Sequence, residues 1–230
     1  AKGRQIYGYS KNDYLSTVDK IKSTLDFTGK ATQTETRHKK GTNAELVLVD
    51  SFEYDHAGRL LSQKQAINGS TQEIIASNNY DSLGQHVSKG VGGKTTQRRL
   101  QNVDYKYNIR GWLKSINDTN TIGNDLFSFA INYNTPTDAS KALYNGNISQ
   151  TFWRTANTTD TSLKNYLYSY DALNRLTLAT DNQSRYKEQL GYDANGNITF
   201  LQRDGNTVAG TQNYGAIDNL AYVYSGNRLD

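Results

Sequence analysis

The chain has 230 residues, of which 35% are hydrophobic and 21% are charged, and its formal net charge is +4. No stretch approaches the roughly 20 consecutive apolar residues that span a bilayer, and an aromatic content of 11% is too high for a disordered linker. The sequence has no cysteine, which excludes disulfides, thiol nucleophiles and thiolate metal sites.

The N-terminal segment 12–25 is the stretch with nearly helical spacing of apolar residues. Val18, Ile21 and Leu25 recur at intervals of three and four, which predicts a short helix over 12–25 as an addition to a β structure.

From residue 25 onward one short motif recurs, in which an Asp or Asn that usually follows a tyrosine is followed three residues later by Gly or Asn. The full-length copies, in chain order, are Leu25-Asp26-Phe27-Thr28-Gly29-Lys30, Tyr54-Asp55-His56-Ala57-Gly58-Arg59-Leu60, Tyr80-Asp81-Ser82-Leu83-Gly84, Tyr107-Asn108-Ile109-Arg110-Gly111-Trp112-Leu113, Tyr170-Asp171-Ala172-Leu173-Asn174-Arg175-Leu176 and Tyr192-Asp193-Ala194-Asn195-Gly196-Asn197-Ile198. Shortened copies are Tyr144-Asn145-Gly146-Asn147-Ile148 and Tyr224-Ser225-Gly226-Asn227-Arg228-Leu229. The turns near 26, 55, 81, 108, 145, 171, 193 and 225 therefore predict a single repeat array of about eight units over residues 1–230.

Each full-length copy has the chemistry of a hairpin turn. Asp accepts hydrogen bonds from backbone N–H groups at the start of a type I turn, and Gly at the fourth position tolerates a positive φ. Asn174 stands in the Gly position of one copy, and Asn is the residue that adopts this conformation most readily after Gly. The Asn-Gly and Ser-Gly pairs of the shortened copies predict tighter two-residue hairpins.

The residues around each turn alternate as in strands. Phe52 and Tyr54 lie two apart, so their side chains share one face, and Leu60 follows the turn where it faces Tyr54 across the hairpin. The predicted fold is all-β, with repeated antiparallel hairpins in one long twisted sheet, forming a thin shell rather than a single compact core. The residues assigned to this structural repeat motif are Tyr54, Asp55, Gly58, Arg59, Tyr80, Asp81, Gly84, Tyr107, Asn108, Gly111, Tyr170, Asp171, Asn174, Arg175, Tyr192, Asp193 and Gly196.

Two loops are expected between these units. Pro136 predicts a break between a strand that ends near Tyr133 and the unit at Tyr144. The run 90–95 has the glycines and lysine of a phosphate-binding loop, but Ser88 replaces the required first Gly, so a glycine-rich hairpin loop is expected instead.

No catalytic, metal or cofactor site is expected. His38, His56 and His86 lie far apart in the sequence, and the repeated aspartates share turn-forming neighbours, which makes them turn residues rather than catalytic carboxylates. Basic residues cluster only at 38–40 and 98–99, so no continuous stripe for nucleic acid is present.

The repeats resemble the YD repeats of the rearrangement-hotspot (RHS) family, whose unit reads Tyr-Asp-x-x-Gly-Arg-Leu. Residues 54–60 match this unit completely, and 170–176 differs only by Asn174. The resemblance extends from about Leu25 to the end, and the copies at 107–112 and 144–148 look like those of Bacteroidota members.

The resemblance implies a segment of a β-sheet strip that spirals into a hollow shell, as in bacterial polymorphic toxins, insecticidal toxin complexes and teneurins. It implies a non-enzymatic part of a large secreted or surface protein that encloses or presents a C-terminal toxin or effector cargo. Its partners would be the neighbouring repeats, the cargo domain and a protein secretion machine. No Asp-Pro-x-Gly-Arg self-cleavage motif is present, so no catalytic residue is carried over.

A second interpretation comes from a different class. Exposed aromatic residues such as Trp112 and Trp153 would stack on sugar rings in a cell-surface adhesin or carbohydrate-binding repeat module. Packing between repeats is the simpler explanation of these residues. The lack of methionine, even at position 1, suggests that the chain is a piece of a longer protein.

Overall fold

The computed structural model describes residues 3–95, 98–156 and 160–230, and nearly all of its regular structure is β. The strands are β1 (Tyr7–Asn12), β2 (Thr17–Leu25), β3 (Ala31–Lys40), β4 (Leu46–Tyr54), β5 (Leu60–Ile67), β6 (Glu73–Tyr80), β7 (His86–Val91), β8 (Gln101–Tyr107), β9 (Leu113–Ile116), β10 (Phe127–Asn132), β11 (Gln150–Thr155), β12 (Lys164–Tyr170), β13 (Leu176–Asp181), β14 (Lys187–Tyr192), β15 (Ile198–Asn206), β16 (Tyr214–Ala221), β17 (Tyr224–Ser225) and β18 (Arg228–Leu229). A 3₁₀ turn, η1 (Ala139–Lys141), is the one helical element of the described residues. The prediction of an all-β fold is confirmed.

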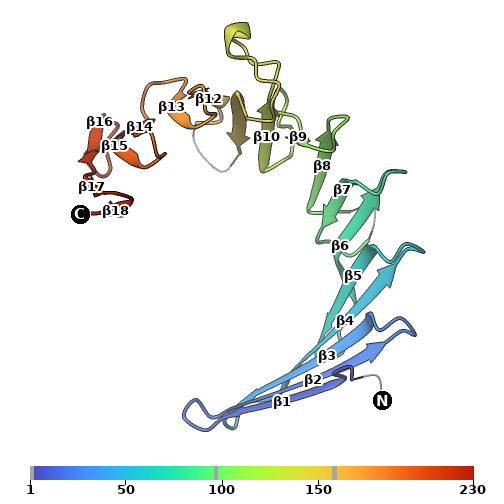
Figure 1. Cartoon of the computed structure of the whole chain (residues 1–230). Coiled ribbons are helices and arrows are strands. Elements are labelled where there is room, and N and C mark those ends of the chain that lie inside the picture. The colour runs from blue at the N-terminus through green and yellow to red at the C-terminus, as the bar shows by residue number, and fades with distance from the viewer. Residues whose placement is uncertain (1–2, 96–97, 157–159) are drawn as a thin grey trace. The chain divides into compact units, whose positions relative to one another are not determined.

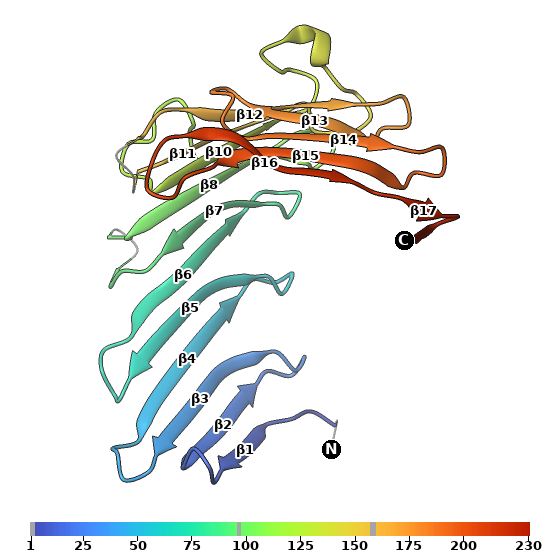
Figure 2. The same cartoon turned by 90° about the vertical axis from the view of Figure 1, so that its left-hand side faces the viewer.

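The chain divides into two compact units, 1–105 and 106–230. Strands β1 to β16 are ordered in the sheet as in the sequence, and the paired strands are antiparallel. Because consecutive strands run in opposite directions, their connections alternate between two ends of the strands, which Figure 2 shows. The strands of each unit thus form a meander of hairpins (Figure 1).

The full-length motif copies occupy every second connection of this meander. In unit 1 they join β2 to β3, β4 to β5 and β6 to β7, and in unit 2 they join β12 to β13 and β14 to β15. The copy at 108–112 lies between β8 and β9. Within each unit all motif turns therefore lie at the same end of the strands, which we call the motif end.

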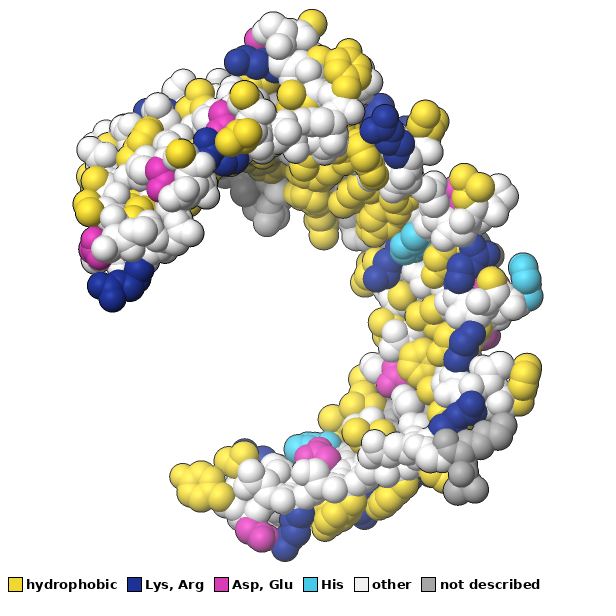
Figure 3. Space-filling view, in the orientation of Figure 1, with side chains coloured by type: hydrophobic (Ala, Val, Ile, Leu, Met, Phe, Trp, Pro, Cys, Tyr) yellow, Lys and Arg dark blue, Asp and Glu magenta, His cyan; other side chains and the backbone are white. Residues whose placement is uncertain are grey.

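The sheet has little interior. Among the described residues the buried apolar side chains are Ala66, Ala76, Ile131, Ala179 and the loop residue Pro136. Most tyrosines and leucines of the strands are half-buried, and hydrophobic and charged side chains are mixed over the surface (Figure 3). Stability must come mainly from the strand ladders and from contacts between neighbouring hairpins, as in repeat proteins.

The helix expected over 12–25 is wrong. Residues 17–25 form β2, which pairs with β3 from Thr17 to Leu25. Val18 and Ile21 are β-branched and favour a strand, and Ser16 has a φ of 52°, which ends regular structure before β2.

Of the two expected two-residue hairpins, one forms and the other does not. Asn145-Gly146 does not form a two-residue hairpin, because Asn132 pairs directly with Gln150 and the segment between them is one long connection. The Ser-Gly copy does form a two-residue hairpin, in which Gly226 and Asn227 join the paired Ser225 and Arg228.

The glycine-rich loop expected at 90–95 begins two residues later. Gly90 and Val91 belong to β7, and Gly92 and Gly93 have positive φ. Gly90 pairs with Ser77 and Asn102 within the sheet, and a side chain there would be crowded, because a Cβ would lie 2.8 Å from both Arg99 Nε and Ser77 Oγ.

Candidate functional site: the coupled motif turns

All full-length motif turns have the same backbone hydrogen bonds. The N–H of the fourth residue donates to the carbonyl of the first, and the N–H of the first donates to the carbonyl of the fifth. Donor–acceptor distances are 2.9 to 3.2 Å at the turns that start at Asp26, Asp55, Asp81, Asn108, Asp171 and Asp193. The fourth residue has a positive φ in each turn, including 63° at Asn174. This is the three-residue hairpin in which a type I turn is followed by a left-handed residue, with the accompanying bulge in the ladder.

The carboxylate of the first residue stabilises the turn from inside. Asp55 Oδ1 accepts the N–H of Arg59 at 2.8 Å, and Asp171 Oδ1 accepts the N–H of Arg175 at 2.9 Å. These backbone hydrogen bonds lower the pKa of both carboxyl groups, and the hydrogen bond from the arginine side chain adds to the effect. Asn108 accepts the N–H of Trp112 in the same way, at 3.0 Å.

The fifth residue of two turns is an arginine that pairs with the same carboxylate. Arg59 Nε lies 2.6 Å from Asp55 Oδ2, and Arg175 Nε lies 2.6 Å from Asp171 Oδ2. Both pairs are partly open to solvent, so the ion pair by itself contributes little to stability. Its main effect is to hold the guanidinium in a fixed position.

That position is over the next tyrosine of the array. The Arg59 guanidinium carbon lies 4.7 Å from the ring centre of Tyr80, and that of Arg175 lies 4.6 Å from the ring centre of Tyr192. Arg175 Nη1 also donates to the carbonyl of Asp193 at 3.0 Å. A fixed cation over an aromatic ring is attractive, so the arginine of one turn binds the next hairpin.

Lys30 plays the same part in the first turn. Its Nζ lies 5.5 Å from the ring centre of Tyr54 and donates to the carbonyl of Gly58 at 3.1 Å.

Two motif glycines, Gly58 and Gly84, also lie directly beside the cation of the preceding turn. A Cβ on Gly84 would lie 3.0 Å from Arg59 Nη1, and a Cβ on Gly58 would overlap Lys30 Nζ. In these two turns the cation of the preceding turn lies where a side chain would be, whereas a Cβ on Gly196 would lie at an ordinary contact distance of 3.9 Å from Arg175 Nη1.

The tyrosine hydroxyl of a hairpin forms a hydrogen bond to the hairpin that precedes it in the chain. It donates to the carbonyl of the residue that follows the preceding turn. The pairs are Tyr54 with Ala31 at 2.9 Å, Tyr80 with Leu60 at 3.0 Å, Tyr170 with Ile148 at 2.9 Å and Tyr192 with Leu176 at 2.7 Å. At Tyr54, Tyr80 and Tyr192 the hairpin thus has a cation bound from the hairpin before it and returns a hydrogen bond to that hairpin, whereas Tyr170 makes the hydrogen bond alone.

The turn at 108–112 departs from this pattern. Trp112 stands in the place of the arginine, and the acceptor after the turn, Leu113 O, receives the hydroxyl of Tyr133 at 3.2 Å. Trp112 and Tyr133 lie 5.2 Å apart between ring centres, and Arg110 lies over the Trp112 ring. Burial raises the pKa of Tyr133.

A related turn, which the sequence motif does not identify, lies at the opposite end of the strands. Asp181 accepts the N–H of Arg185 at 2.7 Å, Ser184 has a φ of 53°, and the Arg185 guanidinium lies 5.6 Å from the ring centre of Tyr214. The spacing of Asp181 and Arg185 equals that of the motif. It was overlooked because Ser replaces Gly and no tyrosine precedes the Asp.

The two tryptophans, which only the second interpretation makes exposed sugar-stacking residues, are both half-buried. Trp153 stacks on Tyr166 at 5.6 Å between ring centres, and Trp112 packs as described above. In the described part of the chain, no three His, Asp or Glu side chains gather where they could hold a metal ion. No helix among those residues is long and apolar enough to cross a membrane.

Comparison with known proteins places the fold. No protein-family model and no curated protein matches the chain. Solved structures do match: the Tc holotoxin pore of Photorhabdus luminescens with the TccC3 mutation D651A, at 20% identity and a TM-score of 0.57, covers 86% of this chain. The TcdB2-TccC3-TEV structure matches at 15% identity and a TM-score of 0.59, covering 91%, and TcdB2-TccC3 without its hypervariable C-terminal region matches at 17% and 0.51, covering 93%.

This chain spans only 9%, 11% and 12% of the length of those three chains. At these identities the likeness concerns the fold. The chain therefore has the fold of a part of these toxin chains, in support of its resemblance to the YD repeats of the RHS family.

Proposed function

We propose that the chain is a non-enzymatic segment of an RHS/YD-repeat shell, forming one array of about eight units over residues 1–230. In a longer protein, secreted or at the cell surface, this shell would enclose or present a toxin or effector cargo that follows the repeats. Its partners would be neighbouring repeats, that cargo and a protein secretion machine.

The observation that carries this proposal is the coupling of successive motif turns. Arg59 and Arg175 bind the next hairpin, and the tyrosine hydroxyls bind the preceding one. The assigned motif residues are thus used in contacts between hairpins, which is what an extended wall without a compact core requires. The likeness to Tc toxin chains supports the same interpretation.

The test uses the full-length natural protein that contains this segment. Limited proteolysis followed by intact mass spectrometry should leave a C-terminal piece that stays uncleaved and elutes with the repeats. The variant Gly58→Val disturbs a motif turn and should make that piece cleavable, whereas Gly8→Val, in strand β1, should leave it protected. Cleavage of the C-terminal piece at the same rate with intact and disturbed repeats would contradict an enclosing shell.

The second candidate function is a carbohydrate-binding repeat module. One observation favours it, a pocket beside Trp112 in unit 2, which the next subsection develops. A shell segment can carry such a pocket, so the two functions do not exclude each other.

A further inference from the structure

The long connection between β10 and β11 is the main irregular feature at the motif end of unit 2. It is fixed to the turn before it, because a Cβ on Gly146 would lie 2.9 Å from the Trp112 ring. It is also fixed to the hairpin after it, because Asn145 Nδ2 donates to Asn174 Oδ1 at 2.5 Å and Lys141 Nζ lies 3.4 Å from Ser169 Oγ. The connection is therefore held by contacts on both sides, to the turn before it and to the hairpin after it.

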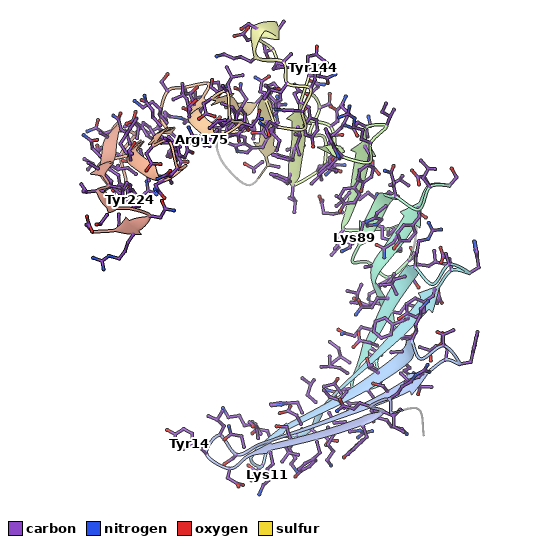
Figure 4. The ribbon with its side chains drawn as sticks, viewed as in Figure 1. Lys11, Tyr14, Lys89, Tyr144, Arg175 and Tyr224 are labelled. Carbon is purple, nitrogen blue, oxygen red and sulfur yellow. The ribbon has the colours of Figure 1, made fainter. Side chains whose placement is uncertain are left out.

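This connection and the turn at 108–112 enclose a pocket of about 210 Å³. Its lining comes from Asn108, Arg110, Trp112, Tyr133, Asn134 and Tyr144, with Ile109 and Leu143 completing it. Figure 4 labels Tyr144 on this connection. Three aromatic residues and two asparagines thus line one space, and the amide oxygen of Asn108 accepts the N–H groups of Arg110 and Trp112 within its turn.

Two of the residues that line the pocket are largely exposed to solvent. Tyr144 is 74% exposed and Ile109 is fully exposed. Their surfaces contribute little to packing of the sheet. Exposed aromatic and aliphatic groups beside a preformed pocket are typical of a ligand site.

The chemistry of the lining selects the ligand. Arg110 is the one charged residue among the lining residues, so a neutral or anionic ligand is favoured, and a carboxylate would match the guanidinium geometry. Aromatic rings with amide groups suit a small ring that has both apolar and hydroxyl surfaces. The volume lies below the roughly 300 to 1,000 Å³ of pockets for larger organic ligands.

We propose that this pocket binds one carboxylated sugar residue, of the uronic acid type, with its ring against Tyr144 and its carboxylate on Arg110. This site is independent of the proposed shell function, because none of the shell contacts between motif turns requires the pocket to be filled.

The test is a binding titration of the whole chain in a Trp153→Phe background, where Trp112 is the remaining tryptophan. The ligands are methyl glucuronide, the neutral methyl glucoside and acetate. Binding is measured by the change in Trp112 fluorescence and, for the two sugars, by saturation-transfer NMR. We expect saturable binding of the glucuronide and binding about tenfold weaker for the other two ligands, because the glucoside lacks the carboxylate and acetate lacks the sugar ring.

Matched variants locate the site. Tyr144→Ala should weaken glucuronide binding about tenfold, whereas Tyr14→Ala, which removes a tyrosine that is 95% exposed in unit 1, should not. Arg110→Gln should bring the glucuronide to the affinity of the glucoside, whereas Arg228→Gln should leave the difference intact.

Circular dichroism melts confirm that each variant is folded. The proposal is overturned if neither signal shows glucuronide binding, if Tyr144→Ala binds as tightly as the parent, or if glucoside and glucuronide bind equally well. None of these results depends on whether a cargo is enclosed, so the site and the shell function can fail separately.

Discussion

Replacing Tyr192 by Phe measures how much one hydrogen bond from a tyrosine to the preceding hairpin contributes to the free energy of unfolding. The change removes the hydroxyl that donates to Leu176 O at 2.7 Å and keeps the ring beneath Arg175. A hydrogen bond of this kind contributes about 0.5 to 1.5 kcal/mol net. We therefore expect the free energy of unfolding to fall by about 1 kcal/mol, and the melting temperature to fall by about 2 to 4 °C for a chain of this size.

The assay is urea denaturation followed by circular dichroism, with Tyr144→Phe as the control. Tyr144 is also in unit 2 and is 74% exposed, so its hydroxyl should contribute almost nothing. If the midpoints of the two variants agree within error, the hydroxyl does not couple the hairpins and the reasoning is refuted.

The same argument extends to the set of equivalent tyrosines, which are Tyr54, Tyr80, Tyr170 and Tyr192. Each lies on a different hairpin, so the effects of the single changes should add. The quadruple Phe variant should lose about 4 kcal/mol, a large fraction of the roughly 5 to 15 kcal/mol of a typical domain.

Three further perturbations test other parts of the array. Gly58→Val should lower the free energy of unfolding by about 1 to 3 kcal/mol because its φ is +80°, while urea melts of Gly8→Val, which has extended backbone, should show a much smaller change. Hydrogen bonds within their turns lower the pKa of Asp55, Asp171 and Asp193, and the pKa of Asp160, outside the motif turns, falls to about 2, mainly through its hydrogen bonds to Ser162. Their stabilisation is complete above the unfolded pKa of about 3.9 and is lost as the pH falls through the folded values, so thermal melts should show a steep loss between about pH 4 and 2 that is shallower in Asp171→Asn. Ala179→Leu overfills a site that is 4% exposed and should cost about 1 to 3 kcal/mol in urea melts; a neutral result would mean that the site has room.

The local geometry of the array follows from the sequence because it depends on residues that are close along the chain. Asp55 and Gly58 determine a turn through their own side chain and φ, and Asn174 replaces Gly at the same left-handed position. The alternation that places Tyr54 opposite Leu60 is likewise a local property of the hairpin.

The contacts between hairpins could not be predicted from the sequence. The partners Tyr192 and Leu176 belong to different hairpins, so their contact depends on how one hairpin is placed on the next. The position of Arg59 over Tyr80 depends on the same placement. The short helix was predicted wrongly because apolar spacing at 12–25 was given more weight than the β-branched residues, which pair with β3.

The direction of the tyrosine hydrogen bonds has a consequence for how the wall is assembled. Each hydroxyl reaches back to a carbonyl that lies earlier in the chain, as Tyr80 does to Leu60. If hairpins fold in chain order, each new one therefore finds its acceptor already in place and secures the hairpin before it. In that order of folding, only the last hairpin formed lacks a hydroxyl from a following hairpin.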